Sequence, residues 1–247
     1  EHVLERGTPP QGQGATCPLD GLVRVPLSQV PGGGGQLAER EPVDLGRRDI
    51  DWKGSHHRHQ EWPAQLNRFF VLGPLAVCYR DTGDERYAQA AADYLRDWLR
   101  AHPVVDGRWE KPPYDNVLNL CIRMGETKRL GWIGALPVFA ASPAFDEALI
   151  QAILDSVFAQ LDYLSVNIAQ DINWRIANAD SLVTAGLLLA PDPRAERHLR
   201  FGVQVLRDAF RRQVLPDGAH YERNPSYHHW MATVVRTYWE LDAALNL

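Results

Sequence analysis

Two short segments of the chain carry dense polar side chains. Residues 216–229 place a Pro-Asp-Gly turn before three histidines, two tyrosines, a glutamate and an arginine. Such a set can move protons, because histidine titrates near neutral pH and a positive neighbour lowers the pKa of tyrosine. Residues 167–179 surround Trp174 with asparagines and an arginine, where a helix is expected to begin. An asparagine there is more often a helix cap, but its amide can also donate a hydrogen bond to a bound carboxylate.

The same segments allow a second chemistry. Glycoside hydrolysis needs two carboxylates across a cleft, and Asp171, Asp217 and Glu222 could supply such a pair. The alternative is that Glu222 and Arg223 form a surface ion pair that contributes little. The sequence alone leaves both interpretations open.

Metal and cofactor chemistry has little support in the sequence. His228 and His229 are adjacent and point to different helix faces, so they do not chelate one ion together, and no Cys-x-x-Cys spacing is present. The glycine run 32–35 lacks the Lys-Ser/Thr of a phosphate-binding loop, and no Gly-x-Ser-x-Gly elbow occurs. We therefore expect no metal and no cofactor.

Helices must position these segments, because the apolar residues after residue 52 recur at helical spacing. The first helix is expected from Trp62 past Val77 to a stop at Thr82-Gly83, and the second from a cap at Asp84 to a stop at Pro103. Residues 104–113 are expected to form a loop. Further helices are predicted over 115–124, 128–139, 145–164, 175–189, 193–215 and 227–245. The short connections favour antiparallel helical hairpins, which build bundles, solenoids and toroids alike.

Residues 1–50 differ in composition from the rest. Their prolines and glycines interrupt the chain too often for helices, so we expect an extended arm with a short strand near 22–25. This divides the chain into an arm, 1–50, and a helical domain, 51–247.

Composition limits the partners. The 247 residues include 45% hydrophobic residues and carry a formal net charge of −5, which argues against a nucleic-acid partner. No stretch approaches the apolar length that is needed to span a membrane. Cys78 and Cys121 lie in apolar helical stretches and are expected to be buried thiols, and the odd cysteine count fits a reducing compartment.

Several motifs together resemble a known family. They are Glu61-Trp62, Leu66-Asn67-Arg68-Phe69, the segment 82–87, Trp98 with Pro103, the segment 173–179 and the segment 213–228. Over residues 48–247 the chain resembles the helical domain of heparinase II/III-type polysaccharide lyases, and 213–228 is the most specific match. The resemblance implies an all-α fold, an incomplete α/α toroid of antiparallel helical hairpins with an irregular N-terminal arm. It also implies later helices and a β-sandwich domain beyond Leu247.

The resemblance further implies β-elimination at a uronic acid of an acidic polysaccharide. Asn173 matches the asparagine that neutralises the sugar carboxylate, and Tyr227 matches the tyrosine that moves the proton. The substrate-binding candidates are Trp174, Arg175, His220, Glu222, Arg223, His228 and Arg123. A periplasmic or secreted location is implied by the resemblance alone.

Trp174 departs from the family pattern, because many relatives have a histidine at this place and an indole cannot shuttle protons. A second catalytic histidine would come from the part beyond Leu247, supplied by that domain or by a second chain. Two alternatives to the lyase therefore stay open. They are a non-catalytic carbohydrate-binding or interaction domain derived from such a lyase, and a toroidal glycoside hydrolase.

Overall fold

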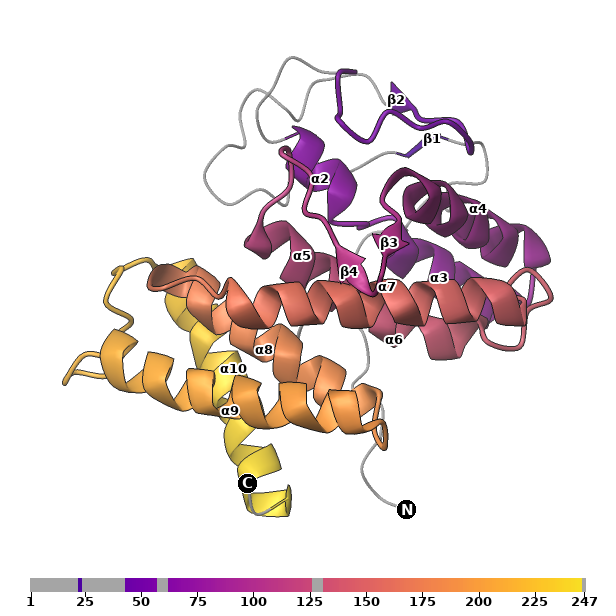
Figure 1. The fold of residues 1–247 in the computed structure, drawn as a ribbon. Helices are drawn as coiled ribbons and strands as arrows, with labels where there is room; N and C mark the ends of the chain where they lie inside the picture. Colours follow the sequence, from indigo (N-terminus) through magenta and orange to yellow (C-terminus); the bar gives the residue numbers. More distant parts are fainter. Residues whose placement is uncertain (1–21, 24–42, 57–61, 126–130, 246–247) are drawn as a thin grey trace.

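The computed structural model describes residues 22–23, 43–56, 62–125 and 131–245, and these are mostly helical (Figure 1). The helices are α2 (Trp62–Asn67), α3 (Leu72–Thr82), α4 (Glu85–Ala101), α5 (Val117–Met124), α6 (Gly131–Phe139), α7 (Glu147–Val166), α8 (Ile172–Leu188), α9 (Pro193–Gln213) and α10 (Pro225–Leu245). The strands are β1 (Leu22–Val23), β2 (Val43–Asp44), β3 (Val104–Val105) and β4 (Arg108–Trp109). The predicted all-α class is confirmed, whereas closure into a toroid and the domain boundary at residue 50 stay predictions.

The boundary between α3 and α4 lies where the sequence predicts it. Gly83 follows α3 in the left-handed conformation with φ of 66°, which glycine adopts without strain. The carboxylate of Asp84 then accepts a hydrogen bond from the backbone N–H of Arg86 at the start of α4. These two residues turn the chain back on itself, so α3 and α4 pack as a hairpin.

The single helix predicted from Trp62 past Val77 is wrong, because the chain breaks between α2 and α3. Phe69 has φ of 56°, which a bulky side chain rarely adopts. Its buried ring stacks on Trp52 at 5.2 Å between centroids and meets Trp132 edge-on at 5.1 Å. Packing of this aromatic cluster therefore overrides the local helical pattern.

The loop predicted for 104–113 contains a hairpin of two short strands. β3 pairs antiparallel with β4, with Val104 opposite Trp109. Asp106 and Gly107 between them both have positive φ, which is the backbone of a type I′ turn. Near the N-terminus β1 pairs with β2, so a strand lies inside the segment 22–25 where one was expected.

Helix α8 passes through the core and begins three residues before its predicted start at Arg175. Where α8 packs on α9, Gly186 lies on α8 and Gly202 lies on α9. A methyl group on Gly186 would lie 2.4 Å from Cβ of Leu199, and one on Gly202 would lie 3.0 Å from the carbonyl oxygen of Ala179. The two glycines let the helices approach closely and fix their relative position (Figure 1).

Two further expectations need correction. By length and composition α7 is apolar enough to cross a membrane, although half of the relevant stretch is buried inside the fold, where it contacts α4 and α9. A core helix has the same composition. Cys121 is a buried thiol as expected, but Cys78 is disulfide-bonded, so a thiol at that position is wrong. Disulfides persist in oxidising compartments, whereas the odd cysteine count fits a reducing one.

Substituting Gly186 with alanine tests the close approach of α8 and α9. Alanine favours a helix by about 1 kcal/mol over glycine, but overpacking in a core costs about 1–3 kcal/mol. We expect Gly186→Ala to lower the free energy of unfolding measured in urea. Gly73→Ala in α3 is the matched control, because nothing lies within 4 Å of its added methyl group. It should be neutral or stabilising, and equal effects of the two changes would contradict the proposed contact.

Candidate functional site

The first turn of α8 is held by side chains from a distant part of the chain. Asp171 precedes the helix, but its side chain makes no capping hydrogen bond. The N–H of Ile172 instead donates to Oη of Tyr221 at 2.8 Å, and the N–H of Asn173 donates to Oε1 of Glu222 at 2.7 Å. These two acceptors satisfy helix N–H groups that have no partner within the helix.

The side chain of Asn173 is bound to the same carboxylate. Its Nδ2 donates to Oε1 of Glu222 at 3.0 Å and lies 3.2 Å from Oε2. Asn173 is therefore the second residue of α8 and a donor, so its interpretation as the helix cap is wrong. A capping side chain accepts from the backbone, and here the carboxylate of Glu222 takes that role.

Two buried residues, Gln213 and His220, complete the attachment of the first turn of α8. Nε2 of Gln213 donates to the carbonyl of Ile172 at 3.0 Å, and Oε1 of Gln213 lies 3.0 Å from Nε2 of His220. Since this amide oxygen only accepts, Nε2 of His220 carries the proton. Burial is the main cause that lowers the pKa of His220, which favours the neutral ring. We call Gln213, His220, Tyr221 and Glu222 the clamp; Gln213 and Tyr221 were missed from the sequence, because no spacing links them to α8.

Tyr227 lies in the first turn of α10, directly after the clamp. Oδ1 of Asn224 accepts the N–H of Ser226 at 2.9 Å and caps that helix. Tyr227 lies five positions after Glu222, so their Cα atoms lie within about 18 Å of each other. The connection from α9 to α10 returns to the end of the molecule where α8 begins (Figure 1). The clamp thus brings the helix junction of Asn173 and that of Tyr227 into one region.

The side chains of the remaining candidates near this region differ in how far they are exposed to solvent. Arg175 is largely buried, and its guanidinium donates to the carbonyl of Ala169 at 3.0 Å and to Asp208 at 2.8 Å. Trp174 is half-buried on α8, whereas Arg223 and His228 are exposed. Arg223 has φ of 53° and ends the turn after His220. Arg175 therefore braces the loop before α8, and Arg223 and His228 face solvent.

Arg123 is not part of the clamp and lies in the last turn of α5, with its side chain in the core. Its guanidinium is fully buried, pairs with Asp115 at 2.9 Å and donates to Oε1 of Gln160 at 2.7 Å. It also lies over the ring of Trp98 at 4.7 Å. With no exposed surface, Arg123 supports the fold in this structure and offers no group to a polymer, contrary to its expected role.

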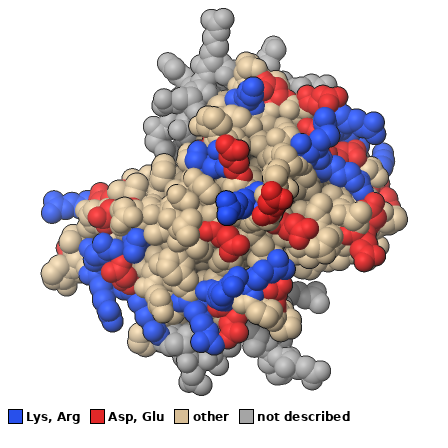
Figure 2. Space-filling model, in the orientation of Figure 1, with Lys and Arg blue, Asp and Glu red and all other residues tan. Residues whose placement is uncertain are grey.

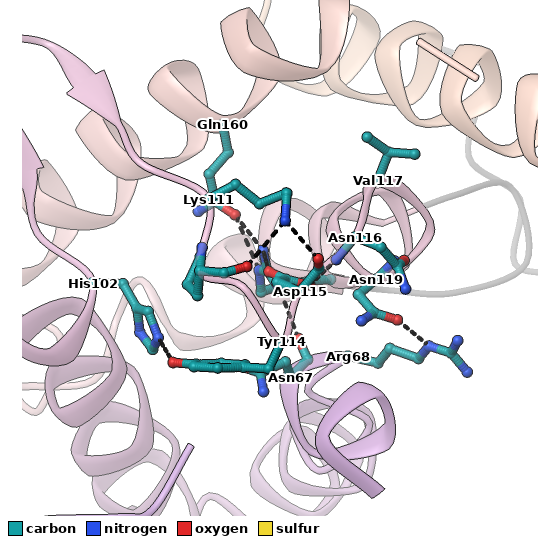
Figure 3. Close-up of polar contacts among 12 residues, drawn as sticks. Asn67, Arg68, His102, Lys111, Tyr114, Asp115, Asn116, Val117, Asn119 and Gln160 are labelled. Carbon is teal, nitrogen blue, oxygen red and sulfur yellow. Dashed lines mark hydrogen bonds and ion pairs between the residues drawn. The ribbon is translucent and has the colours of Figure 1, made fainter. Parts of the chain in front are cut away.

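The same polar network fixes the loop that leads into α5 (Figure 3). Nδ1 of His102 contacts the carbonyl of Trp98 at 2.9 Å, and its Nε2 bonds the hydroxyl of Tyr114. Burial lowers the pKa of His102. Asn178 of α8 then donates to the carbonyl of Val117 at 3.1 Å. The start of α5 is thereby attached to α8, one turn and a half beyond Asn173.

The surface and the ionisable groups add two observations. Basic and acidic side chains are interspersed over the face drawn in Figure 2, in keeping with the modest net charge of −5. Within the part of the chain that the structure describes, no three histidine, cysteine or acidic side chains are grouped to hold a metal ion. The described site therefore consists of amide, phenol, imidazole and carboxylate groups.

Comparisons with known proteins point to one family. Residues 39–245 match the family model described as the heparinase II/III N-terminus. A heparin-sulfate lyase of Pedobacter heparinus is 30% identical over 185 residues, which are 73% of this chain and 27% of that enzyme. A heparin-sulfate lyase of Bacteroides thetaiotaomicron is 27% identical over 187 residues, 72% of this chain and 25% of the enzyme.

Solved structures give the same result. The crystal structure of heparinase III matches with a TM-score of 0.72 and 26% identity, over 83% of this chain and 31% of that one. Heparan sulfate lyase HepC from Pedobacter heparinus matches with a TM-score of 0.69 and 27% identity, over 84% of this chain and 32% of that one. The chain thus spans about a quarter to a third of the length of these relatives.

Replacing Asp115 tests whether the buried Arg123 stabilises the fold. Asp115→Ala leaves the buried guanidinium without its carboxylate partner, and such a loss costs about 3–5 kcal/mol. We expect the free energy of unfolding to fall by that amount in a denaturant titration. Glu196→Ala is the control, because it breaks the exposed pair of Glu196 with Arg200, for which about 1 kcal/mol or less is expected. A loss at Asp115 no larger than that at Glu196 would contradict the structural role.

Proposed function

The chain belongs to the heparinase II/III family through its N-terminal domain, and from this premise we propose that it forms the helical part of a polysaccharide lyase. The proposed reaction is β-elimination at a uronic acid of an acidic polysaccharide. The named relatives are heparin-sulfate lyases, so a heparan-type polymer is the first substrate to test. Because the chain spans only part of those enzymes, we propose that a following β-sandwich domain or a second chain completes the site.

The observation that carries the proposal is the attachment of the Asn173 junction to the segment that leads into Tyr227. Elimination needs a group that stabilises the charge growing on the uronate carboxylate and a group that takes the proton from C5. Both must reach one sugar ring. The hydrogen bonds from Asn173 to Glu222, five residues before Tyr227, support such a site.

We assign the two roles by donor and acceptor chemistry. The second N–H of the Asn173 amide binds the uronate carboxylate, and the N-terminus of α8 favours the negative charge there. Tyr227 removes the C5 proton, the C4–C5 double bond forms as the C4–O bond breaks, and Tyr227 passes the proton on to the leaving oxygen. No group in this step is oxidised or reduced. His228 and Arg223, exposed in the same turn region, are the candidates to favour the phenolate.

Tyr227→Phe in the full-length protein tests the reaction. Loss of a proton-transfer group typically costs about 10²–10⁴-fold, so the ultraviolet absorbance of unsaturated uronide should nearly vanish while polymer binding is retained. Tyr79→Phe, far along the chain in α3, is the matched control and should keep wild-type activity. Heparan-type, hyaluronan-type and alginate polymers form the substrate panel. New reducing ends without the absorbance would support a glycoside hydrolase, and binding without either would support a non-catalytic binding domain.

Asn173→Ala tests carboxylate neutralisation separately. Removal of one donor to a developing anion costs about 10²–10³-fold in kcat, and KM should change less. Trp174→His tests the departure from the family pattern, since a histidine adds a proton carrier that an indole lacks. Higher activity of Trp174→His would mean that the tryptophan costs catalytic power. Unchanged kcat in Asn173→Ala would remove Asn173 from the mechanism.

A further inference from the structure

Among the residues that the structure describes, Glu222 forms hydrogen bonds with one neighbour, Asn173. Its two carboxylate oxygens meet the backbone N–H of Asn173 at 2.7 Å and the side-chain nitrogen of Asn173 at 3.0 and 3.2 Å. The residues are 49 positions apart, so this contact does not follow from local helix geometry. Using the same oxygens to bind an acidic sugar would place two anions together, which does not fit the role of a substrate ligand expected from the sequence.

An ionised carboxylate also fixes the direction of the amide. The nitrogen and oxygen of an asparagine amide have the same shape, and only their hydrogen-bond partners distinguish them. A carboxylate accepts and does not donate, so the nitrogen of Asn173 must face Glu222. One N–H is then used by Glu222, while the second N–H keeps a defined direction. A neutral partner that both donates and accepts would allow the opposite orientation.

The backbone of Ile172 is held in an unfavourable conformation. Ile172 has φ of 60°, a conformation that a β-branched residue rarely adopts. Three hydrogen bonds from the clamp keep it there: to Tyr221 at 2.8 Å, from Gln213 at 3.0 Å, and from the next N–H to Glu222 at 2.7 Å. Strained backbone of this kind persists only where its surroundings over-determine it, and it gathers at functional sites.

We propose that Glu222 is a positioning residue for the elimination, which fixes the Asn173 amide so that its free N–H points at the uronate carboxylate. This rests on the proposed function for its catalytic meaning. Its structural part, the fixed amide, stands by itself. Glu222 does not touch the substrate and acts only through Asn173.

Nuclear magnetic resonance of the 247-residue chain tests the fixed amide without any need for activity. The side-chain NH₂ signal of Asn173 is assigned by its loss in Asn173→Ala. In the wild type we expect a hydrogen-bonded shift, slow exchange with water and a nuclear Overhauser contact to the Glu222 side chain. Glu222→Gln should move this signal toward that of a free amide, and Glu196→Gln, a change at an exposed glutamate of α9, should not. A wild-type signal with no contact to Glu222, or one unmoved by Glu222→Gln, would overturn the proposal.

Kinetics of the full-length protein test whether Glu222 acts through Asn173. A displacement of about 1 Å in a positioned group can cost about 10²-fold, so Glu222→Gln should lower kcat/KM by up to that factor. The double variant Asn173→Ala with Glu222→Gln should be no slower than Asn173→Ala alone, because coupled residues are not additive. Losses that multiply would show an independent role and overturn the proposal. Melting temperatures of all variants verify folding.

The two measurements separate the possible failures. If the wild type cleaves no polymer but the amide signal behaves as expected, the proposed function fails and the fixed amide stands. If the wild type cleaves a heparan-type polymer but Glu222→Gln leaves the amide signal and kcat/KM unchanged, the lyase stands and the positioning role fails.

Discussion

The first turn of α8 depends on acceptors that its own sequence does not supply. A helix begins with N–H groups that lack partners, and a preceding side chain usually accepts one of them. Asp171 does not do so here, and Tyr221 and Glu222 accept from Ile172 and Asn173 instead. Holding Ile172 at positive φ costs about 1–3 kcal/mol. The hydrogen bonds of the clamp and the favourable position of a carboxylate at a helix N-terminus offset this cost.

The core gives this turn a rigid base. Behind it, α8 contacts α9 through Gly186 and Gly202, and Asn178 attaches it to the start of α5. The loop that leads into α5 is fixed in turn by the buried pair of Arg123 and Asp115. The polar groups of the junction therefore lie on elements whose positions are set by packing, which is what a site with defined geometry requires.

Local signals in the sequence predicted local structure well. The glycine and aspartate between α3 and α4 act through neighbouring residues, and the structure has both where they were expected. The break at Phe69 was not predictable, because the aromatic cluster that causes it is assembled from several elements. The segments of Asn173 and Glu222 were both identified as polar. Their hydrogen bonds were not, since no pattern in a single sequence links residues 49 positions apart.

The clamp also affects the order in which the domain can assemble. The last stabilising contacts of α8 come from residues that follow α9, so the chain must first complete α9 and its turn. Closing a loop of 49 positions has an entropic cost of roughly 3–4 kcal/mol from its length-dependent part. Contacts so distant in sequence tend to form late in folding. During synthesis, the body of α8 can therefore pack before its first turn is held in place, because the clamp residues that bind this turn are added to the chain later.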